Sequence, residues 1–386
     1  MADMSLLTRF MIHTSPRMSL HEKRVQVWQR VIPDMATRRE YLMHLLLTLA
    51  GEHALYEGYV SNSIPPGTDN NPPLPRIGEH GAQLDYHQVI QHHQRGLEGF
   101  RKALADLSPA TAEDVFCGSL LLVAIAFASI SIRDLDSPEL GLIHATDPRT
   151  PYTDWLYHVR GLTSIVGEYW FTLKLGRLRS MLSYTYATGT WKPALPALPA
   201  SPFPRLETGS PMLSVFAQGA SHALQLLRSF AARLSSNPTA LGDAAEGHPE
   251  VADGSLHDHV NTIDSLAEIY TRVLQAFQFS QSERDCSASL DVQMDLEDSA
   301  ITSWPPMLSD TFIASLKPSE QVGISEGFSY VILAHFYLTL ALFENIWYFN
   351  RGPRAEIGKI FSLVEQVNNP ELLALMTWPM AVIGGH

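Results

Sequence analysis

Apolar residues recur at spacings of three and four along most of the chain, which is the period of an α-helix. Runs that alternate polar residues with apolar β-branched ones, the usual sign of a strand, are few. Residues 350–353 (Asn-Arg-Gly-Pro) and 368–370 (Asn-Asn-Pro) mark breaks between helices, because glycine favours helix ends and proline favours helix starts. Thr37 and Thr111 are the expected caps of two further helices. The pattern predicts an all-α protein.

Two apolar stretches have nearly the length of a membrane span. Residues 115–132 contain no charged side chain, and residues 328–343 contain only His335 as a group that can become charged. Small and polar residues interrupt both stretches, and neither has basic flanks or a belt of aromatic residues. We therefore expect central helices of a core and no membrane span.

Four segments break the helical pattern and are predicted to be loop insertions in a single helical domain over residues 1–386. They are the proline-rich segments 61–84 and 188–211, and segments 236–253 and 281–309, which are rich in Ser, Gly, Asp and Glu. Between residues 281 and 300, six acidic residues stand against one basic residue. A solvated acidic loop is expected there, and an acidic activation segment is the alternative.

The charge and the cysteine content exclude several classes of function. The 386 residues include 27 Lys and Arg against 40 Asp and Glu, which gives a formal net charge of −13. Without a cluster of basic residues, we expect no direct contact with nucleic acid. Cys117 and Cys286 are too few for a disulfide framework or a cysteine-based zinc module, and the N-terminus has no basic region before an apolar stretch. A reducing compartment, cytoplasmic and/or nuclear, is expected.

Motifs for nucleotide binding, serine hydrolysis and metalloprotease chemistry are missing from the sequence, so we expect no cofactor and no metal. His87, His92 and His93 lie on one predicted helix, but spacings of five and six do not place two of them one turn apart. His257 and His259 flank an aspartate at a predicted helix start after a loop rich in Gly and Asp. We expect them at the surface.

Two groups of side chains are candidates for catalysis. Asp154 and His158 are four residues apart on a predicted helix, so the carboxylate could orient the imidazole as a general base while Arg160 holds an anionic group. The alternative is a salt bridge between helices and a capped helix start. His335 lies in the middle of an apolar run, where it either lines a cavity or is a core histidine with a satisfied hydrogen bond.

Aromatic side chains on the apolar helices could form the wall of a ligand site in an apolar central cavity. Ordinary packing of the core explains them equally well. The candidates for ligand binding are Trp155, Phe127, Phe328, Tyr337 and Trp347.

Several segments together carry a family resemblance: residues 6–11, 28–33, 41–50 with His53, 86–104, 115–132, 154–161 and 375–379. In these segments the chain resembles the C-terminal regulatory domain of fungal-specific zinc-cluster transcription factors, in particular the branch of sterol-uptake regulators. The resemblance implies an all-α bundle with a deep apolar cavity for a sterol-like or other hydrophobic molecule. It also implies an N-terminal DNA-binding module with six cysteines and two zinc ions, which the two cysteines of this sequence cannot form.

The resemblance favours a stand-alone regulatory or ligand-sensing protein that lacks its own DNA-binding module. Its expected partners are a hydrophobic small molecule and a separate DNA-binding regulator. The alternative is an enzyme of secondary metabolism that uses the same cavity as a cyclase, isomerase or pericyclic catalyst, since shape and desolvation can lower such barriers without a nucleophile.

Overall fold

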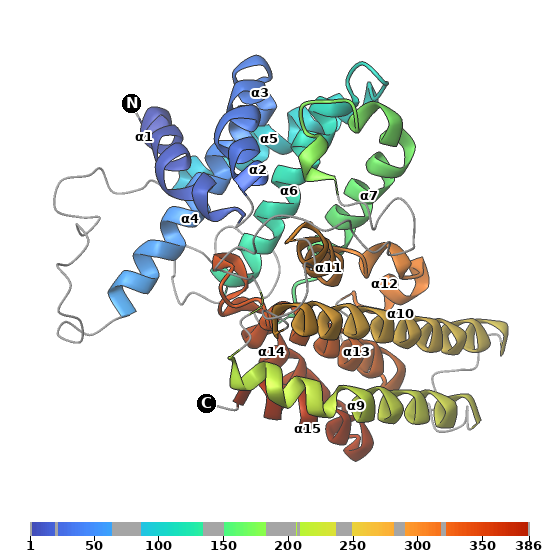
Figure 1. Cartoon of the computed structure of the whole chain (residues 1–386). Helices are drawn as coiled ribbons and strands as arrows, with labels where there is room; N and C mark the ends of the chain where they lie inside the picture. Colours follow the sequence, from blue (N-terminus) through green and yellow to red (C-terminus); the bar gives the residue numbers. More distant parts are fainter. Residues whose placement is uncertain are drawn as a thin grey trace. The chain divides into compact units, whose positions relative to one another are not determined.

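The computed structural model describes residues 2–19, 22–63, 86–133, 150–182, 206, 209–236, 249–281, 290–317 and 322–384 (Figure 1). Over these residues the chain forms helices and no strand, which confirms the all-α prediction. Contacts between Cα atoms group the chain into two compact units. The first comprises Met1–Pro148, His158–Leu182 and Ile346–Tyr348; the second comprises Arg149–Tyr157, Ser183–Asn345 and Phe349–His386. A single domain stays a prediction.

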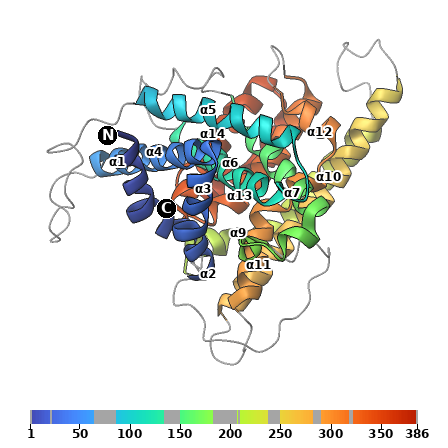
Figure 2. The same ribbon diagram turned by 90° about the horizontal axis from the view of Figure 1, so that it is seen from above.

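The first unit is built on three long helices, in which α4 packs against both α5 and α6. Figure 2 shows α4 and α5 side by side. Glycine permits this approach: a Cβ on Gly96 would lie 2.6 Å from the Cδ2 atom of Leu45. The elements here are α1 (Ala2–Arg9), η1 (Phe10–Thr14), η2 (Ser15–Arg17), α2 (Glu22–Gln26), η3 (Val27–Val31), α3 (Ile32–Arg38), α4 (Glu40–Ser63), α5 (Tyr86–Ala105), α6 (Ala112–Ile132), most of α7 (Asp154–Leu173) and η5 (Arg179–Met181).

The two predicted caps differ from the structure. Thr37 lies within α3, and the break before α4 falls at Arg39, whose backbone is extended (φ −131°, ψ 110°). Thr111 does precede α6, but its side chain makes no capping bond to that helix. Its hydroxyl instead donates to the backbone oxygen of Asp106 at 3.0 Å, because a threonine hydroxyl can satisfy the preceding turn as well as the following helix.

The second unit places α13 against α14 and α15, and α9 against α10 and α15. Helix α10 also packs against α11. In Figure 1, α9 and α10 run alongside each other in yellow and gold. The elements are α9 (Pro211–Ser236), α10 (Pro249–Gln281), α11 (Leu290–Thr302), η7 (Pro305–Met307), α12 (Asp310–Ser315), α13 (Ile324–Ala341), α14 (Gly352–Val367) and α15 (Pro370–Gly384); η8 (Trp347–Phe349) spans the division between the units.

Both long apolar stretches form helices, α6 and α13. Each is long and apolar enough to cross a membrane by length and composition, yet most of each is buried inside the structure, as in the core helices of other proteins. Their side chains supply much of the buried apolar surface, which is the main favourable term in folding. The expectation of buried core helices is confirmed.

The predicted loops are partly helical. Residues 64–84, 188–205, 237–248 and 282–289 lie outside the described residues. The loop prediction was wrong at 249–253, which begin α10, and at 290–302, which form α11. The acidic composition of 281–300 obscured an apolar face: Leu296 and Ala300 lie four positions apart and are buried.

Candidate functional site

A surface hollow of about 400 Å³ lies on α1 and η1 in the first unit. Its lining side chains are Met4, Ser5, Thr8, Arg9, Ile12 and His13. Met4 and Ile12 are apolar and strongly exposed, at 65% and 60%. The hollow therefore combines apolar contact area with polar groups that can orient a ligand.

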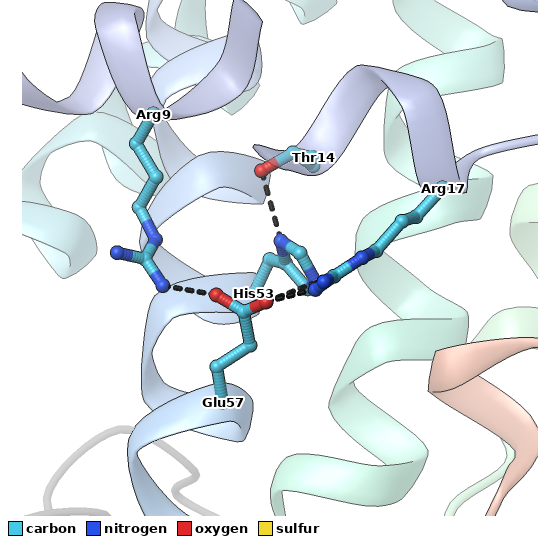
Figure 3. A network of polar contacts seen from close by, with 5 residues as sticks. All are labelled: Arg9, Thr14, Arg17, His53 and Glu57. Atoms are coloured by element: carbon cyan, nitrogen blue, oxygen red, sulfur yellow. Dashed lines mark hydrogen bonds and ion pairs between the residues drawn. The ribbon is translucent and has the colours of Figure 1, made fainter. Parts of the chain in front are cut away.

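A network of polar contacts lies next to this hollow and joins α1, η1 and η2 to α4 (Figure 3). Arg9 and Arg17 form ion pairs with the two carboxylate oxygens of Glu57, Arg9 with Oε2 and Arg17 with Oε1. His53 lies one helical turn before Glu57, and its Nδ1 is 3.0 Å from Oγ1 of Thr14. Helix α4 thus supplies the carboxylate and the imidazole, and the N-terminal segment supplies two guanidinium groups and a hydroxyl.

Both ring nitrogens of His53 face polar groups. Its Nε2 atom lies 3.5 Å from Nη1 of Arg17, which can only donate, and 3.7 Å from Oε1 of Glu57, which can only accept. Its Nδ1 atom lies within hydrogen-bond distance of the Thr14 hydroxyl, which can donate or accept. His53 is fully buried, and this burial lowers its pKa to about 4, against the opposing effect of Glu57. The imidazole is neutral at pH 7.

Glu57 keeps its negative charge. Burial acts to raise the pKa of this carboxyl, but His53, Arg17 and Arg9 together hold it below its usual range. Two guanidinium groups against one carboxylate leave an excess of positive charge. The Nε atom of Arg9 is buried and has no hydrogen-bond partner within the described residues. This unsatisfied donor belongs to a side chain that lines the hollow, but the Nε atom is itself buried, so a ligand oxygen reaches it only if the side chain turns.

An aromatic ring packs against His53 on α4. The ring centroid of Trp347 lies 4.7 Å from that of His53, and Tyr56 contacts Trp347 at 5.4 Å. Phe127 stacks on Tyr348 with centroids 6.1 Å apart. Two of the five residues predicted to bind a ligand, Phe127 and Trp347, are thus packing residues of the first unit.

Sequence reasoning did not identify Arg9, Arg17 or Glu57 as site residues. One signal was available, because His53 and Glu57 are four residues apart on a helix and therefore share a face. Their partners lie 36 to 48 positions earlier in the sequence, and only the fold brings them within reach.

Trp155 and Tyr337 belong to an aromatic cluster of the second unit. Trp155 stacks on Phe336 with centroids 5.4 Å apart, and Phe336 stacks on Trp304 at 4.3 Å. The Nε1–H group of Trp155 donates to the hydroxyl of Tyr337 at 3.1 Å, and this hydroxyl donates to the backbone oxygen of Tyr152. All these rings are buried, so they fill the core.

Phe328, also in the second unit, contacts Phe230 at 4.7 Å and His259 at 5.0 Å between ring centroids. The expectation that His259 lies at the surface was wrong. Helix α10 begins at Pro249, so His259 lies within the helix, where it is buried with Nε2 2.8 Å from Oγ of Ser329. The side chain of His257 lies outside the described residues. Phe312 contacts both His259 and Trp304, so the five aromatic candidates occupy two clusters, one in each unit, and a common ligand wall stays a prediction.

The candidate catalytic residues fall into both units. Asp154 is exposed in the first turn of α7, whereas His158 and Arg160 are half-buried. Asp154 and His335 belong to the second unit, and His158 and Arg160 to the first. Their catalytic role stays a prediction.

His335 has the geometry of a core histidine. It is buried in α13, and its Nε2–H group donates to the backbone oxygen of Leu375 at 3.1 Å. Burial lowers its pKa to about 4, although the bond to Leu375 acts in the opposite direction. Its Nδ1 atom has no hydrogen-bond partner among the described residues.

His92, on the predicted histidine helix, pairs with a residue of another helix. Its Nδ1 lies 2.8 Å from Nδ1 of His44 on α4, and its Nε2 lies 3.3 Å from the carboxylate of Asp3. His87 is exposed. Within the described ranges, no three His, Cys, Asp or Glu side chains are grouped to hold a metal ion.

Comparison with known proteins assigns the first part of the chain. Residues 5–188 match the family model for a fungal specific transcription factor domain, which confirms the family resemblance over just under half of the chain. The matched region contains the hollow and the polar network on α4. No curated protein and no solved structure matches the chain.

Proposed function

We propose that this protein has a regulatory role, which its match to a fungal specific transcription factor domain supports, and that a small molecule controls it. This molecule has an apolar body and an anionic head, and it binds at the hollow on α1 and η1. The observation that carries the proposal is the position of Arg9, which lines the hollow beside Met4 and Ile12 and has an unpartnered donor. Arginine suits a carboxylate because its donors match both oxygens.

The network gives the ligand a means of control. Arg9 is one of two cations that hold the N-terminal segment to Glu57 on α4. An anionic ligand competes with Glu57 for Arg9 and so changes how firmly this segment is held. A ligand shifts a conformational equilibrium only through such differential contacts.

The proposal assigns DNA contact to a region outside residues 1–386. These residues hold two cysteines, and their formal net charge is −13. A regulator of this kind would act in the nucleus or cytoplasm.

Dodecanoate and its methyl ester are suitable probes, because they share an apolar chain and differ in the charged head. We expect isothermal titration calorimetry to detect binding of dodecanoate and about tenfold weaker binding of the ester, since the ester cannot form a charged pair with Arg9. Equal affinity for both probes, or no binding of either, would contradict the proposal.

Two arginine variants separate the ligand role from the structural role. Arg9 and Arg17 both pair with Glu57, but only Arg9 lines the hollow. We expect Arg9→Gln to lose most of the affinity for dodecanoate and Arg17→Gln to retain it. Ile12→Ser, at an exposed position that lines the hollow, should weaken the binding of both probes. Met11→Ser, at an exposed position outside the lining, should leave the binding of both probes unchanged. A loss of affinity that is the same in both arginine variants would indicate a structural effect.

A further inference from the structure

The end of helix α7 exposes two large apolar side chains. Phe171 is 74% exposed and Leu175 is 80% exposed. They are four residues apart, and the bond from the N–H of Leu175 to the backbone oxygen of Thr172 continues the helical turn that keeps them together. Tyr169 has a non-helical backbone (φ −108°, ψ 20°), so the helix changes direction just before this pair. The pair forms an exposed apolar face within the first unit.

A positive charge lies against this face. The Nζ atom of Lys174 lies 4.5 Å from the centre of the Phe171 ring, in a cation–π contact. Arg179 is exposed on η5. Residues 170–182 contain three basic residues and no acidic one, although the whole chain has a formal net charge of −13. The local charge is therefore opposite in sign to that of the protein.

Two carboxylates close to this segment are already engaged. Asp34 on α3 pairs with Arg177 at 2.7 Å and with Arg38 at 3.0 Å, and Oε1 of Glu113 accepts from the backbone N–H of Leu178 at 2.8 Å. Within the described ranges, neither Lys174 nor Arg179 has a carboxylate within ion-pair distance. Lys174 beside the apolar pair, and Arg179 four residues after Leu175, are thus available to an external partner.

We propose that Phe171, Lys174, Leu175 and Arg179, the α7 surface, bind an acidic amphipathic segment of a partner protein. Apolar side chains of that segment would cover Phe171 and Leu175, and its carboxylates would pair with Lys174 and Arg179. Complementary charge favours this partner over a basic one. The exposed apolar pair favours a protein segment over nucleic acid, since the phosphate backbone of nucleic acid offers charge and no apolar surface to cover it. This inference is independent of the ligand proposed for the hollow.

The probe is a fluorescein-labelled helical peptide that has leucine at every third or fourth position and glutamate at the others. The control peptide has lysine in place of each glutamate. We expect fluorescence anisotropy to show binding of the glutamate peptide, weakened by added salt, and no binding of the lysine peptide. Absence of binding by the glutamate peptide, or equal binding of both peptides, would overturn the proposal.

Protein variants locate the binding. F171S/L175S and K174E/R179E should each raise the Kd for the glutamate peptide by roughly tenfold or more, because they remove the apolar anchors and reverse the charges. L104S/R101E changes the same residue types at exposed positions of α5 and should bind as the wild type does. Because all these positions are exposed, far-ultraviolet circular dichroism should show folded variants; if the apolar variant does not fold, the charge variant alone decides. Equal affinity in all variants would exclude the α7 surface.

Two other binding partners of the α7 surface would overturn the proposal. Sedimentation velocity would reveal a second copy of this chain as the partner, if a dimer is present and F171S/L175S abolishes it. Cosedimentation with vesicles of phosphatidylcholine and phosphatidylserine would reveal a membrane surface, if the vesicles bind the wild type through Phe171 and the glutamate peptide does not bind.

Discussion

The imidazole of His53 and the hydroxyl of Thr14 share a hydrogen bond, with 3.0 Å between Nδ1 and Oγ1 and both side chains fully buried. This contact joins α4 to η1, next to the pairs that Glu57 forms with Arg9 and Arg17. A buried hydrogen bond contributes most when the loss of one partner leaves the other unsatisfied. The attachment of the N-terminal segment therefore depends on polar contacts as well as on apolar packing.

Replacement of Glu57 by glutamine should loosen this segment. The substitution removes the charge that holds both arginines, at a cost of about 1–2 kcal/mol, because the side chain is still 21% exposed and partly screened by solvent. Hydrogen exchange at the amides of residues 4–17 should become faster. Glu98→Gln is the matched control, since Glu98 pairs with Lys102 on an exposed face. Unchanged exchange in the Glu57 variant would show that apolar packing alone holds the segment.

Acid should destabilise the second unit through His335. The pKa of its imidazole is about 4 in the folded protein, below the usual value of 6.5, because burial disfavours the charged form. Between pH 6.5 and 4 the unfolded chain binds more protons than the folded one, so the free energy of unfolding falls as the pH falls through this window. His335→Gln, which can still donate to Leu375, should weaken this dependence, while His259 in the same unit, whose pKa burial also lowers to about 4, keeps its share.

Urea unfolding at pH 7 and pH 5, followed by tryptophan fluorescence, measures the effect. His222→Gln changes an exposed histidine of α9 and should leave the pH dependence of the wild type in place. If the free energy of unfolding changes between pH 7 and pH 5 as much in the His335 variant as in the wild type, this histidine does not contribute to the acid sensitivity.

Tyr337→Phe should destabilise the second unit more than Tyr330→Phe. The hydroxyl of Tyr337 accepts from Trp155 and donates to the backbone oxygen of Tyr152, whereas within the described part of the chain the hydroxyl of Tyr330 only donates to the backbone oxygen of Leu316. We expect a loss of about 1–3 kcal/mol for Tyr337→Phe and about 1 kcal/mol for Tyr330→Phe. Equilibrium unfolding in urea should give this order, and the reverse order would contradict it.

Gly219→Ala should disturb the contact between α9 and α15. An added Cβ at Gly219 would overlap the Nε1 atom of Trp378, so the indole or one of the helices must shift, at a cost of about 1–3 kcal/mol. Gly358 on α14 has open space at the same position. Gly358→Ala should therefore stabilise the protein by up to about 1 kcal/mol, through helix propensity. Thermal unfolding should show shifts of opposite sign, and a stabilised Gly219 variant would refute the packing argument.

The spacing of apolar residues along the sequence was sufficient to predict that the chain is helical. The stretches 115–132 and 328–343 form buried helices, because burial in the core removes the surface of a long apolar segment from water. The same reasoning failed at 290–302, where acidic residues masked the apolar face of α11. It also failed at His259, since the first turns of α10 lie in a segment that composition assigned to a loop.

By itself, the sequence determined that this protein is helical, that it is strongly acidic, and that residues 5–188 resemble fungal transcription factor domains. The tertiary structure decided which polar groups meet. His53 and Glu57 share a helix face by periodicity, but their contacts with Thr14, Arg9 and Arg17 need α1 to η2 folded onto α4. Such contacts are set by the packing of helices distant in sequence, and helix periodicity carries information only about neighbours within a few turns.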